Sequence, residues 1–157
     1  MRIRRARPAD AAVLSDLARR AKASWGYPAP WLDAWRAELT VSPDYLAAQT
    51  AFVADIDGRP AGLCVIEDHG ARWSLEHVWV APEVQGRGVG RTLVARALDE
   101  AASRRPGPVE VLSDPHAESF YLRLGARRVG AVPAPMPGAP DRVLPRLLLD
   151  AAPRGTA

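Results

Sequence analysis

A run of glycines that alternate with larger residues is the part of this sequence best suited to chemistry. It consists of Gln85, Gly86, Arg87, Gly88, Val89, Gly90 and Arg91. Backbone N–H groups at the start of a helix lack intrahelical partners and carry the positive end of the helix dipole, so they bind phosphate readily. Glycine at every second position lets successive amides approach one anion, and the arginines can add charge-assisted contacts. A tight turn alone needs one or two glycines, so the run favours a phosphate-binding loop over a simple strand-to-helix turn.

Two common glycine-rich phosphate loops do not fit this run. The third glycine of the dinucleotide fingerprint would fall at position 91, where this chain has arginine. The P-loop of nucleotide hydrolases requires Gly-Lys-Ser/Thr, which is also missing. The sequence therefore predicts a phosphate loop of another class.

The elements expected to position this loop are an apolar strand before it and an amphipathic helix after it. Residues 72–80 are strand-like, and apolar residues recur at helical spacing through residues 88–103. Upstream, the strand-like residues 50–56 and 59–67 are separated by Asp57-Gly58, a strong β-hairpin signal. The three strands are expected to form an antiparallel meander that leads into the glycine run.

The remaining segments complete an α/β (α+β) pattern. It predicts a single domain over residues 1–157, with a mixed central sheet of about six or seven strands flanked by helices and a frayed tail at residues 150–157. Proline in the last strand places that strand at an edge or a bulge. The segments expected are a strand at 3–6, a helix from 8–10 to 23, a proline-broken aromatic loop at 25–31, short helices at 35–39 and 43–48, a strand at 109–113, a helix at 116–124 capped by Gly125, a strand at 127–132, a loop at 133–140 and a strand at 142–149.

Two segments resemble conserved blocks of one known superfamily. Residues 80–90, Val-Ala-Pro-Glu-Val-Gln-Gly-Arg-Gly-Val-Gly, resemble a signature Arg/Gln-x-x-Gly-x-Gly/Ala that follows a strand, with Gln85, Gly88 and Gly90 at its fixed positions. Residues 114–126, Asp-Pro-His-Ala-Glu-Ser-Phe-Tyr-Leu-Arg-Leu-Gly-Ala, are similar to a second block ending in Tyr-x-x-Leu-Gly-Phe. By these motifs the chain resembles the GCN5-related N-acetyltransferase (GNAT) superfamily, firmly from about residue 51 to residue 132.

The resemblance implies a GNAT-like domain that uses acetyl-CoA as co-substrate and acetylates a primary amine of a small molecule or peptide. Backbone amides from Arg87 to Arg91 would hold the CoA pyrophosphate, and the backbone of Val78, Trp79 and Val80 would pair with the pantetheine arm across a splayed sheet. The chain departs from the family at Asp114, where asparagine is frequent, which weakens the expectation that this side chain contacts the cofactor. It also departs at Ala126, where phenylalanine is usual.

Acetyl transfer to an amine needs a neutral nucleophile, a donor for the developing oxyanion and a proton for the departing thiolate. By the resemblance, Tyr121 lies near the thioester sulfur and could supply that proton; the alternative is a core aromatic residue beside Phe120. Glu76 is the candidate base, against an exposed strand charge. His77 is a further candidate, but strand alternation sends it to the opposite face from Glu76 unless a bulge intervenes.

Aromatic residues gather in the segment that walls the acceptor pocket in proteins of this family. Trp25, Tyr27 and Trp31, with Trp35, could line such a pocket or could cover the sheet as part of the core. The histidines and the single Cys64 lack metal-ligand spacing, so no metal is expected. His69 and His116 are expected at a turn and a helix start, and Cys64 as a buried apolar residue.

Composition limits the function classes. The chain has 157 residues, 48% hydrophobic and 25% charged, with a net charge of +3 and arginines spread along its length. These features do not indicate a nucleic-acid partner, a membrane span or a signal peptide, and they favour a cytoplasmic protein. The main alternative to an enzyme is a noncatalytic CoA-binding regulatory module of the same fold, and a homodimer is possible.

Overall fold

The computed structural model describes residues 1–153, which form two compact units. Unit 1 comprises Met1–Ile66 and His77–Ala97. Unit 2 comprises Glu67–Glu76 and Leu98–Ala157, of which residues 154–157 lie outside the described part.

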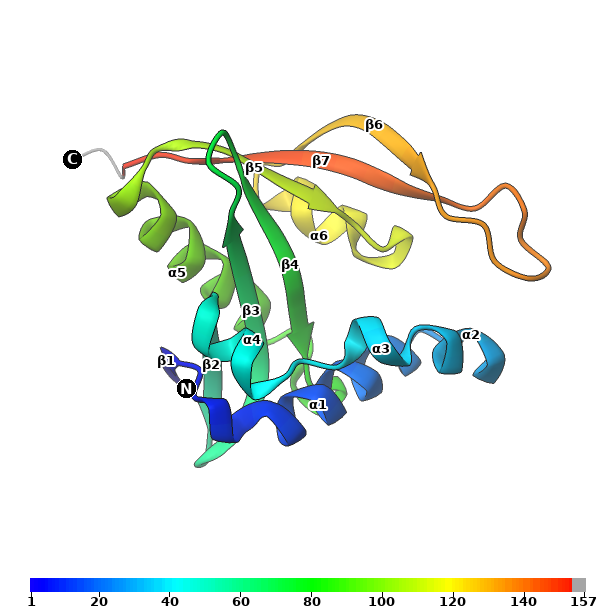
Figure 1. Cartoon of the computed structure of the whole chain (residues 1–157), viewed down its shortest axis with the longest axis horizontal. Coiled ribbons are helices and arrows are strands. Elements are labelled where there is room, and N and C mark those ends of the chain that lie inside the picture. Colours follow the sequence, from blue (N-terminus) through cyan, green and yellow to red (C-terminus); the bar gives the residue numbers. More distant parts are fainter. Residues whose placement is uncertain (154–157) are drawn as a thin grey trace. The chain divides into compact units, whose positions relative to one another are not determined.

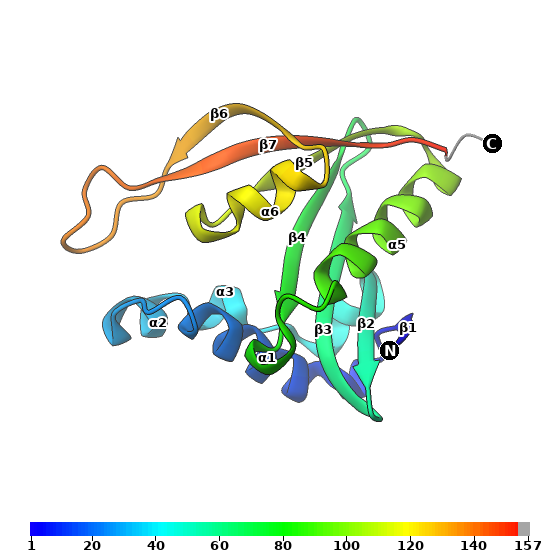
Figure 2. The ribbon, with the colours of Figure 1, turned by 180° about the vertical axis from the view of Figure 1, so that it is seen from behind.

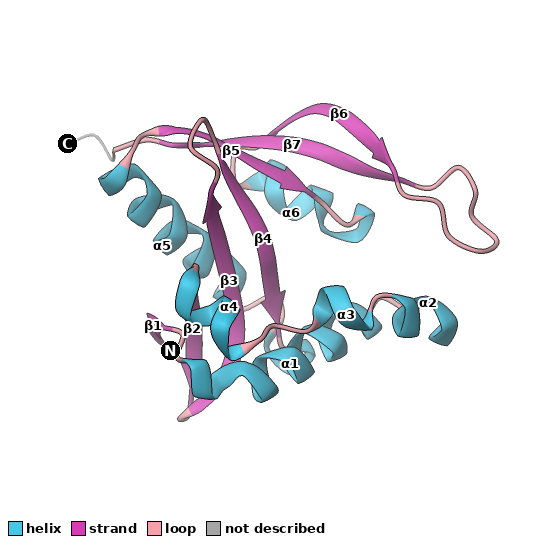
Figure 3. Ribbon diagram, viewed as in Figure 1, coloured by secondary structure: helices cyan, strands magenta, loops and turns pink. Residues whose placement is uncertain are grey.

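Seven strands pair in the order β1-β2-β3-β4-β5-β7-β6, which confirms the predicted α/β class with a mixed sheet flanked by helices (Figures 1 and 3). β1 pairs antiparallel with β2, and β2 with β3. The connection from β3 to β4 is four residues long, which allows only an antiparallel pair, so the predicted meander is confirmed. The strands are β1 (Arg2–Arg5), β2 (Thr50–Ile56), β3 (Arg59–Asp68), β4 (Trp73–Val80), β5 (Gly107–Leu112), β6 (Arg127–Pro133) and β7 (Val143–Ala151).

The helices agree with the sequence pattern except in the aromatic segment. There a helix begins at Ala29, inside the stretch predicted as a proline-broken loop. The correction has a simple cause: Pro30 lies in the first turn, where a helix needs no N–H donor, so the proline starts the helix instead of breaking it. The helices are α1 (Ala11–Ala23), α2 (Ala29–Ala34), α3 (Arg36–Leu39), α4 (Pro43–Ala48), α5 (Val89–Arg104) and α6 (Glu118–Arg123), and short 3-10 helices occupy Pro8–Asp10, Pro82–Val84 and Pro115–Ala117.

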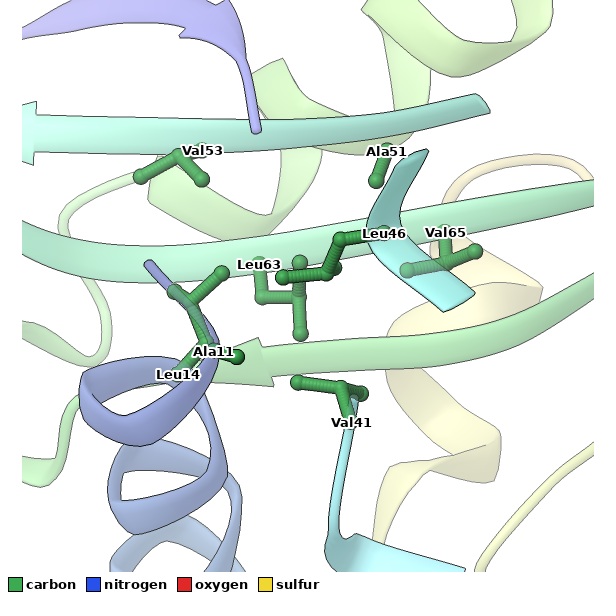
Figure 4. Packing of buried hydrophobic residues seen from close by; sticks show 8 residues of the cluster. All are labelled: Ala11, Leu14, Val41, Leu46, Ala51, Val53, Leu63 and Val65. Carbon is green, nitrogen blue, oxygen red and sulfur yellow. The ribbon is translucent and has the colours of Figure 1, made fainter. Parts of the chain in front are cut away.

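The hairpin between β2 and β3 sets which side chains of unit 1 face each side of the sheet. Asp57 and Gly58 both have positive φ, 51° and 76°, as a two-residue type I′ turn requires. On one face, the odd-numbered residues of both strands pack with α1 and α4 (Figure 4). The residues of this core cluster are Ala11, Leu14, Val41, Leu46, Ala51, Val53, Leu63 and Val65.

The even-numbered residues of β2 and β3 face the first half of α5. Figures 1 and 2, seen from opposite sides, place α4 in front of β2 and β3 in one view and α5 in front of them in the other. The guanidinium of Arg96 in α5 lies 4.4 Å from the ring centroid of Phe52 in β2. At Gly62 the helix comes so close that an added Cβ would lie 2.7 Å from Leu93 Cδ1 and 3.0 Å from Val89 Cγ1. Gly62 therefore sets the distance between β3 and the start of α5. This helix begins at Val89, within the glycine run.

We expect Gly62→Val to lower the free energy of unfolding by about 1–3 kcal/mol, because the new side chain overpacks this contact. Its Cβ would also lie 3.3 Å from the carbonyl oxygen of Trp79, which cannot move as a side chain can. Urea unfolding measures the change. Gly130→Val in β6 is the matched control, since a Cβ there meets nothing within 4 Å. Equal losses in the two variants would show that the close approach is not what limits residue 62.

In unit 2, β7 lies between β5 and β6 and pairs antiparallel with both. Of the two predicted positions for Pro145, an edge or a bulge, the edge is wrong because β7 is internal. The bulge is confirmed, since β6 has a register shift between Arg128 and Gly130, and the next residue of β6 pairs with Pro145. Pro145 has no N–H to donate to a neighbouring strand. It is tolerated because the pairing with β5 ends at Leu112, whose partner is Arg146, so Pro145 lies just beyond the paired residues. β7 continues to Ala151, which pairs with Gly107 and is buried, so the predicted frayed tail begins too early at residue 150.

Candidate functional site

Three hydrogen bonds hold the segment that leads into the glycine run, and two of them join it to strands of the sheet. The N–H of Ala81 donates to the carbonyl of Ala61 in β3, at 2.8 Å. The N–H of Val84 donates to the carbonyl of Ala81 at 3.0 Å, and the side-chain amide of Gln85 donates to the carbonyl of Val80 at 3.2 Å. Gln85, a fixed position of the motif, thus ties the loop back to the end of β4.

The glycine run has the backbone geometry that anion binding requires. Gly86 and Gly88 both have φ of 80°, in the left-handed region that favours glycine. The helix starts at Val89, and its first backbone bond is from the N–H of Thr92 to the carbonyl of Gly88, at 3.0 Å. Within residues 1–153, no acceptor is found for the N–H groups from Gly86 to Arg91. The loop therefore presents unpaired donors at the positive end of a 16-residue helix.

The two arginines of the run keep their charge available. Arg87 and Arg91 are exposed, and neither forms an ion pair with another described residue. By contrast, Glu83, two residues before Gln85, forms an ion pair with Arg20 at 3.2 Å. The guanidinium groups of Arg87 and Arg91 could therefore bind a phosphate at this helix start together with the backbone donors.

The end of β4 carries the residues predicted to hold the pantetheine arm. Val78, Trp79 and Val80 are half-buried in unit 1, and the indole N–H of Trp79 donates to Nδ1 of His77 at 3.0 Å. The parallel pairing of β4 with β5 comprises Trp73 with Val109 and Ser74 with Glu110, and β4 continues for six residues beyond Ser74. That the backbone of Val78–Val80 pairs with a ligand stays a prediction.

Glu76, the candidate base, is part of a hydrogen-bonded group in unit 2. Ser74 Oγ donates to Glu76 Oε1 at 2.6 Å, and His69 Nε2 lies 2.8 Å from the same hydroxyl. Carboxylate oxygens of Glu67 and Glu76 and a ring nitrogen of His69 all lie within 4.8 Å of one another. Ser74 was not predicted to belong to the site, and His69 was expected only in a turn. The predicted hairpin could have indicated this group, because alternate residues of a strand, such as Ser74 and Glu76, lie on the same face of the sheet.

Asp114 and Tyr121, the other motif residues, also lie in unit 2. The Asp114 carboxylate accepts from the N–H of His116 at 2.8 Å, which caps the short helix there, and lies 3.7 Å from Arg142 Nη2. Tyr121 is 6% exposed, and its ring centroid is 5.0 Å from that of Phe120. Asp114 thus has a structural task, while the burial of Tyr121 fits either role proposed for it.

The aromatic residues before and within α2 and α3 form one contiguous cluster in unit 1. Tyr27 stacks on Trp31 with centroids 5.7 Å apart, and both meet the edge of Trp35 at 4.9 and 5.8 Å. Trp25 lies 6.1 Å from Trp79 of β4. Trp35 is 8% exposed and belongs to the core, whereas Trp25, Tyr27 and Trp31 are partly accessible. The cluster therefore contributes to the core and leaves three of its side chains partly accessible.

Cys64 is fully buried in β3, as the sequence predicts, and burial raises the pKa of its thiol to about 12. A thiol with that pKa stays protonated near neutral pH, so it is not a nucleophile. None of the helices among the described residues has the length and apolar character needed to cross a bilayer.

Known proteins resemble this chain in sequence and in fold. The sequence profile of the acetyltransferase (GNAT) family matches residues 13–126, which run through both units. No curated protein sequence matches the chain. Similar solved structures are a GCN5-related N-acetyltransferase from Rhodopseudomonas palustris (TM-score 0.75, 20% identity, 95% of this chain and 93% of that one), the PaiA N-acetyltransferase of Thermoplasma acidophilum in complex with coenzyme A (0.72, 16%, 94% and 96%) and the ribosomal-protein-S18-alanine N-acetyltransferase of Escherichia coli (0.71, 19%, 99% and 96%).

Proposed function

We propose that this chain, which belongs to the acetyltransferase (GNAT) family, transfers an acetyl group from acetyl-CoA directly to a primary amine of a small molecule or peptide. The observation that carries the proposal is the glycine run, where two left-handed glycines precede a long helix with unpaired N–H donors. These donors and the charges of Arg87 and Arg91 suit the pyrophosphate of CoA. The Thermoplasma acidophilum relative, which was solved with coenzyme A, supports this choice of ligand.

We assign each step of the reaction to particular residues of the chain. Backbone donors from Arg87 to Arg91 hold the pyrophosphate, and a backbone N–H of β4 between Val78 and Val80 stabilises the oxyanion. Glu76 accepts a proton from the amine through water as the amine nitrogen forms the new bond to the acetyl carbon. Tyr121 gives a proton to the sulfur as the carbon–sulfur bond breaks. The products are an acetamide and free CoA thiol.

The acceptor is an amine on a small molecule or a peptide. The choice of acceptor depends on the loops and helices that differ most among proteins of this fold, so family membership alone does not identify the acceptor. The relative from Escherichia coli acts on an alanine of a ribosomal protein. For this chain, the aromatic cluster around Trp25, Tyr27 and Trp31 is the proposed acceptor wall.

Thiol release from acetyl-CoA tests the proposal. The assay uses a panel of amines, polyamines, aminoglycosides, amino acids and peptides, with CoA binding followed in parallel by calorimetry. We expect saturable CoA binding and release of thiol that depends on one class of acceptor. CoA binding without release from any acceptor would favour a noncatalytic CoA-binding module, and the absence of CoA binding would overturn the assignment of the loop.

Glu76→Gln is expected to lower kcat/KM about tenfold, less than a base in direct contact would, because we expect the proton to pass through water. The loss should appear in kcat/KM measured by thiol release. Glu38→Gln is the control, since it removes an exposed carboxylate in α3. An unchanged kcat/KM in Glu76→Gln would shift the role of base to His77 or to water.

A further inference from the structure

Lys22 is the only lysine of the chain, and the other 20 basic residues are arginines. Its ammonium nitrogen lies among four aromatic rings of unit 1. The distances to the ring centroids are 4.3 Å for Trp35, 5.3 Å for Tyr27, 5.8 Å for Trp25 and 5.9 Å for Trp79. Each distance is within the range of about 6 Å over which a cation is attracted to a ring face.

The four rings come from different parts of unit 1 and hold one another in place. Tyr27 meets Trp35 edge to face at 4.9 Å, and Trp25 lies 6.1 Å from Trp79. Trp35 is buried and the other three rings are half-buried, so the enclosed cation is partly shielded from water. Shielding strengthens a cation–ring attraction. Ring faces of this kind can hold an ammonium group or a guanidinium group.

We propose that Trp25, Tyr27, Trp35 and Trp79 form a binding site for an organic ammonium cation, and that Lys22 is its intramolecular occupant. We call these four residues the aromatic box. A ligand with an alkylammonium or quaternary ammonium group enters by displacing the Lys22 side chain, whose flexible stem of four carbons allows it to swing away. Ligand and lysine therefore compete for the same ring faces.

The aromatic box also restricts the acceptor, a step that rests on the proposed function. Trp79 belongs to the stretch of β4 assigned to the pantetheine arm, so the box adjoins the end of the cofactor strand. Ring faces stabilise the charged form of an amine, whereas attack on a thioester requires the neutral form. The ammonium group in the box is therefore not the nucleophile. The acceptor carries two groups: a cation held by the box and a separate primary amine that is acetylated.

Choline and its neutral isostere 3,3-dimethylbutan-1-ol test the aromatic box without any acetyl-CoA. Binding is measured by tryptophan fluorescence and calorimetry for the wild type, Lys22→Ala and Lys22→Arg. We expect Lys22→Ala to bind choline about tenfold more tightly than the wild type, because the tethered competitor is gone. Lys22→Arg retains a tethered cation and should show no such gain. The neutral isostere should bind Lys22→Ala at least about tenfold more weakly than choline does.

Equal affinity of Lys22→Ala for choline and for the isostere would overturn the aromatic box, and so would equal gains in the Ala and Arg variants. Lys22→Met, which keeps an apolar stem of similar length, replaces Lys22→Ala if circular dichroism shows that truncation disturbs the fold. Adding Tyr27→Leu, which keeps apolar volume but removes one ring face, should cancel the gain. Because these readouts need no acetyl-CoA, a failed box and a failed acetyltransferase assignment give different results.

Discussion

Gly88→Trp is expected to abolish CoA binding, with a loss of affinity of at least about a hundredfold in calorimetry. A Cβ at Gly88 meets nothing within 4 Å, so the indole would project into the open space in front of the unpaired N–H groups. That space is where the pyrophosphate is proposed to lie. A positive φ of 80° also strains any residue other than glycine, which would turn the neighbouring amides away from a common anion.

Gly70→Trp is the matched control for this substitution. Gly70 has the same φ of 80° and equally open surroundings, but it lies in the turn between β3 and β4. Both variants should lose similar stability, because both place a side chain on left-handed backbone. Only Gly88→Trp should lose CoA. Retained affinity in Gly88→Trp, or an equal loss in Gly70→Trp, would contradict the placement of the pyrophosphate at the glycine run.

Local patterns of the sequence were sufficient for most of the fold. Asp57-Gly58 between two apolar runs gave the hairpin, because few residue pairs adopt two positive φ angles in succession. The change from a two-residue to a 3.6-residue period after residue 80 gave β4 and α5. The glycine run was recognised for a similar reason. Left-handed backbone favours glycine, so the conformation at Gly86 and Gly88 is visible in the sequence as two glycines.

Features that depend on contacts distant in sequence were missed. The internal position of β7 depends on which strands pair. Pro145 indicated an edge or a bulge, but the sequence did not show that the pairing of β7 with β5 stops at Arg146, one residue away. The hydrogen bonds from Ser74 to Glu76 and His69 depend on the hairpin register.

Lys22 was missed for another reason. Composition shows that it is the only lysine, but nothing local to α1 shows that rings from the following loop, from Trp35 between α2 and α3, and from β4 surround its ammonium group. Aromatic residues were predicted to form an acceptor wall or part of the core. The structure adds a cation among them, which changes the chemistry expected of the wall.

Tyr121→Phe is expected to lower kcat about a hundredfold while CoA affinity changes less than about twofold. The substitution removes one hydroxyl from a ring that is 6% exposed and packed 5.0 Å from Phe120, so the phenylalanine can keep the same packing. The departing thiolate then lacks a proton donor. A tyrosine hydroxyl is a proton donor and can serve as this acid.

Tyr45→Phe, which removes a hydroxyl from a partly buried tyrosine in α4, is the control and should keep its kcat. A purely structural role for Tyr121 would lower the free energy of unfolding and leave the pH profile intact. A role as proton donor instead predicts that the fall of activity at high pH, seen when the acid loses its proton, disappears in Tyr121→Phe. If kcat stays unchanged while single-turnover kinetics show that chemistry limits the rate, Tyr121 has no part in the reaction, and the proton must reach the sulfur from solvent or from another residue.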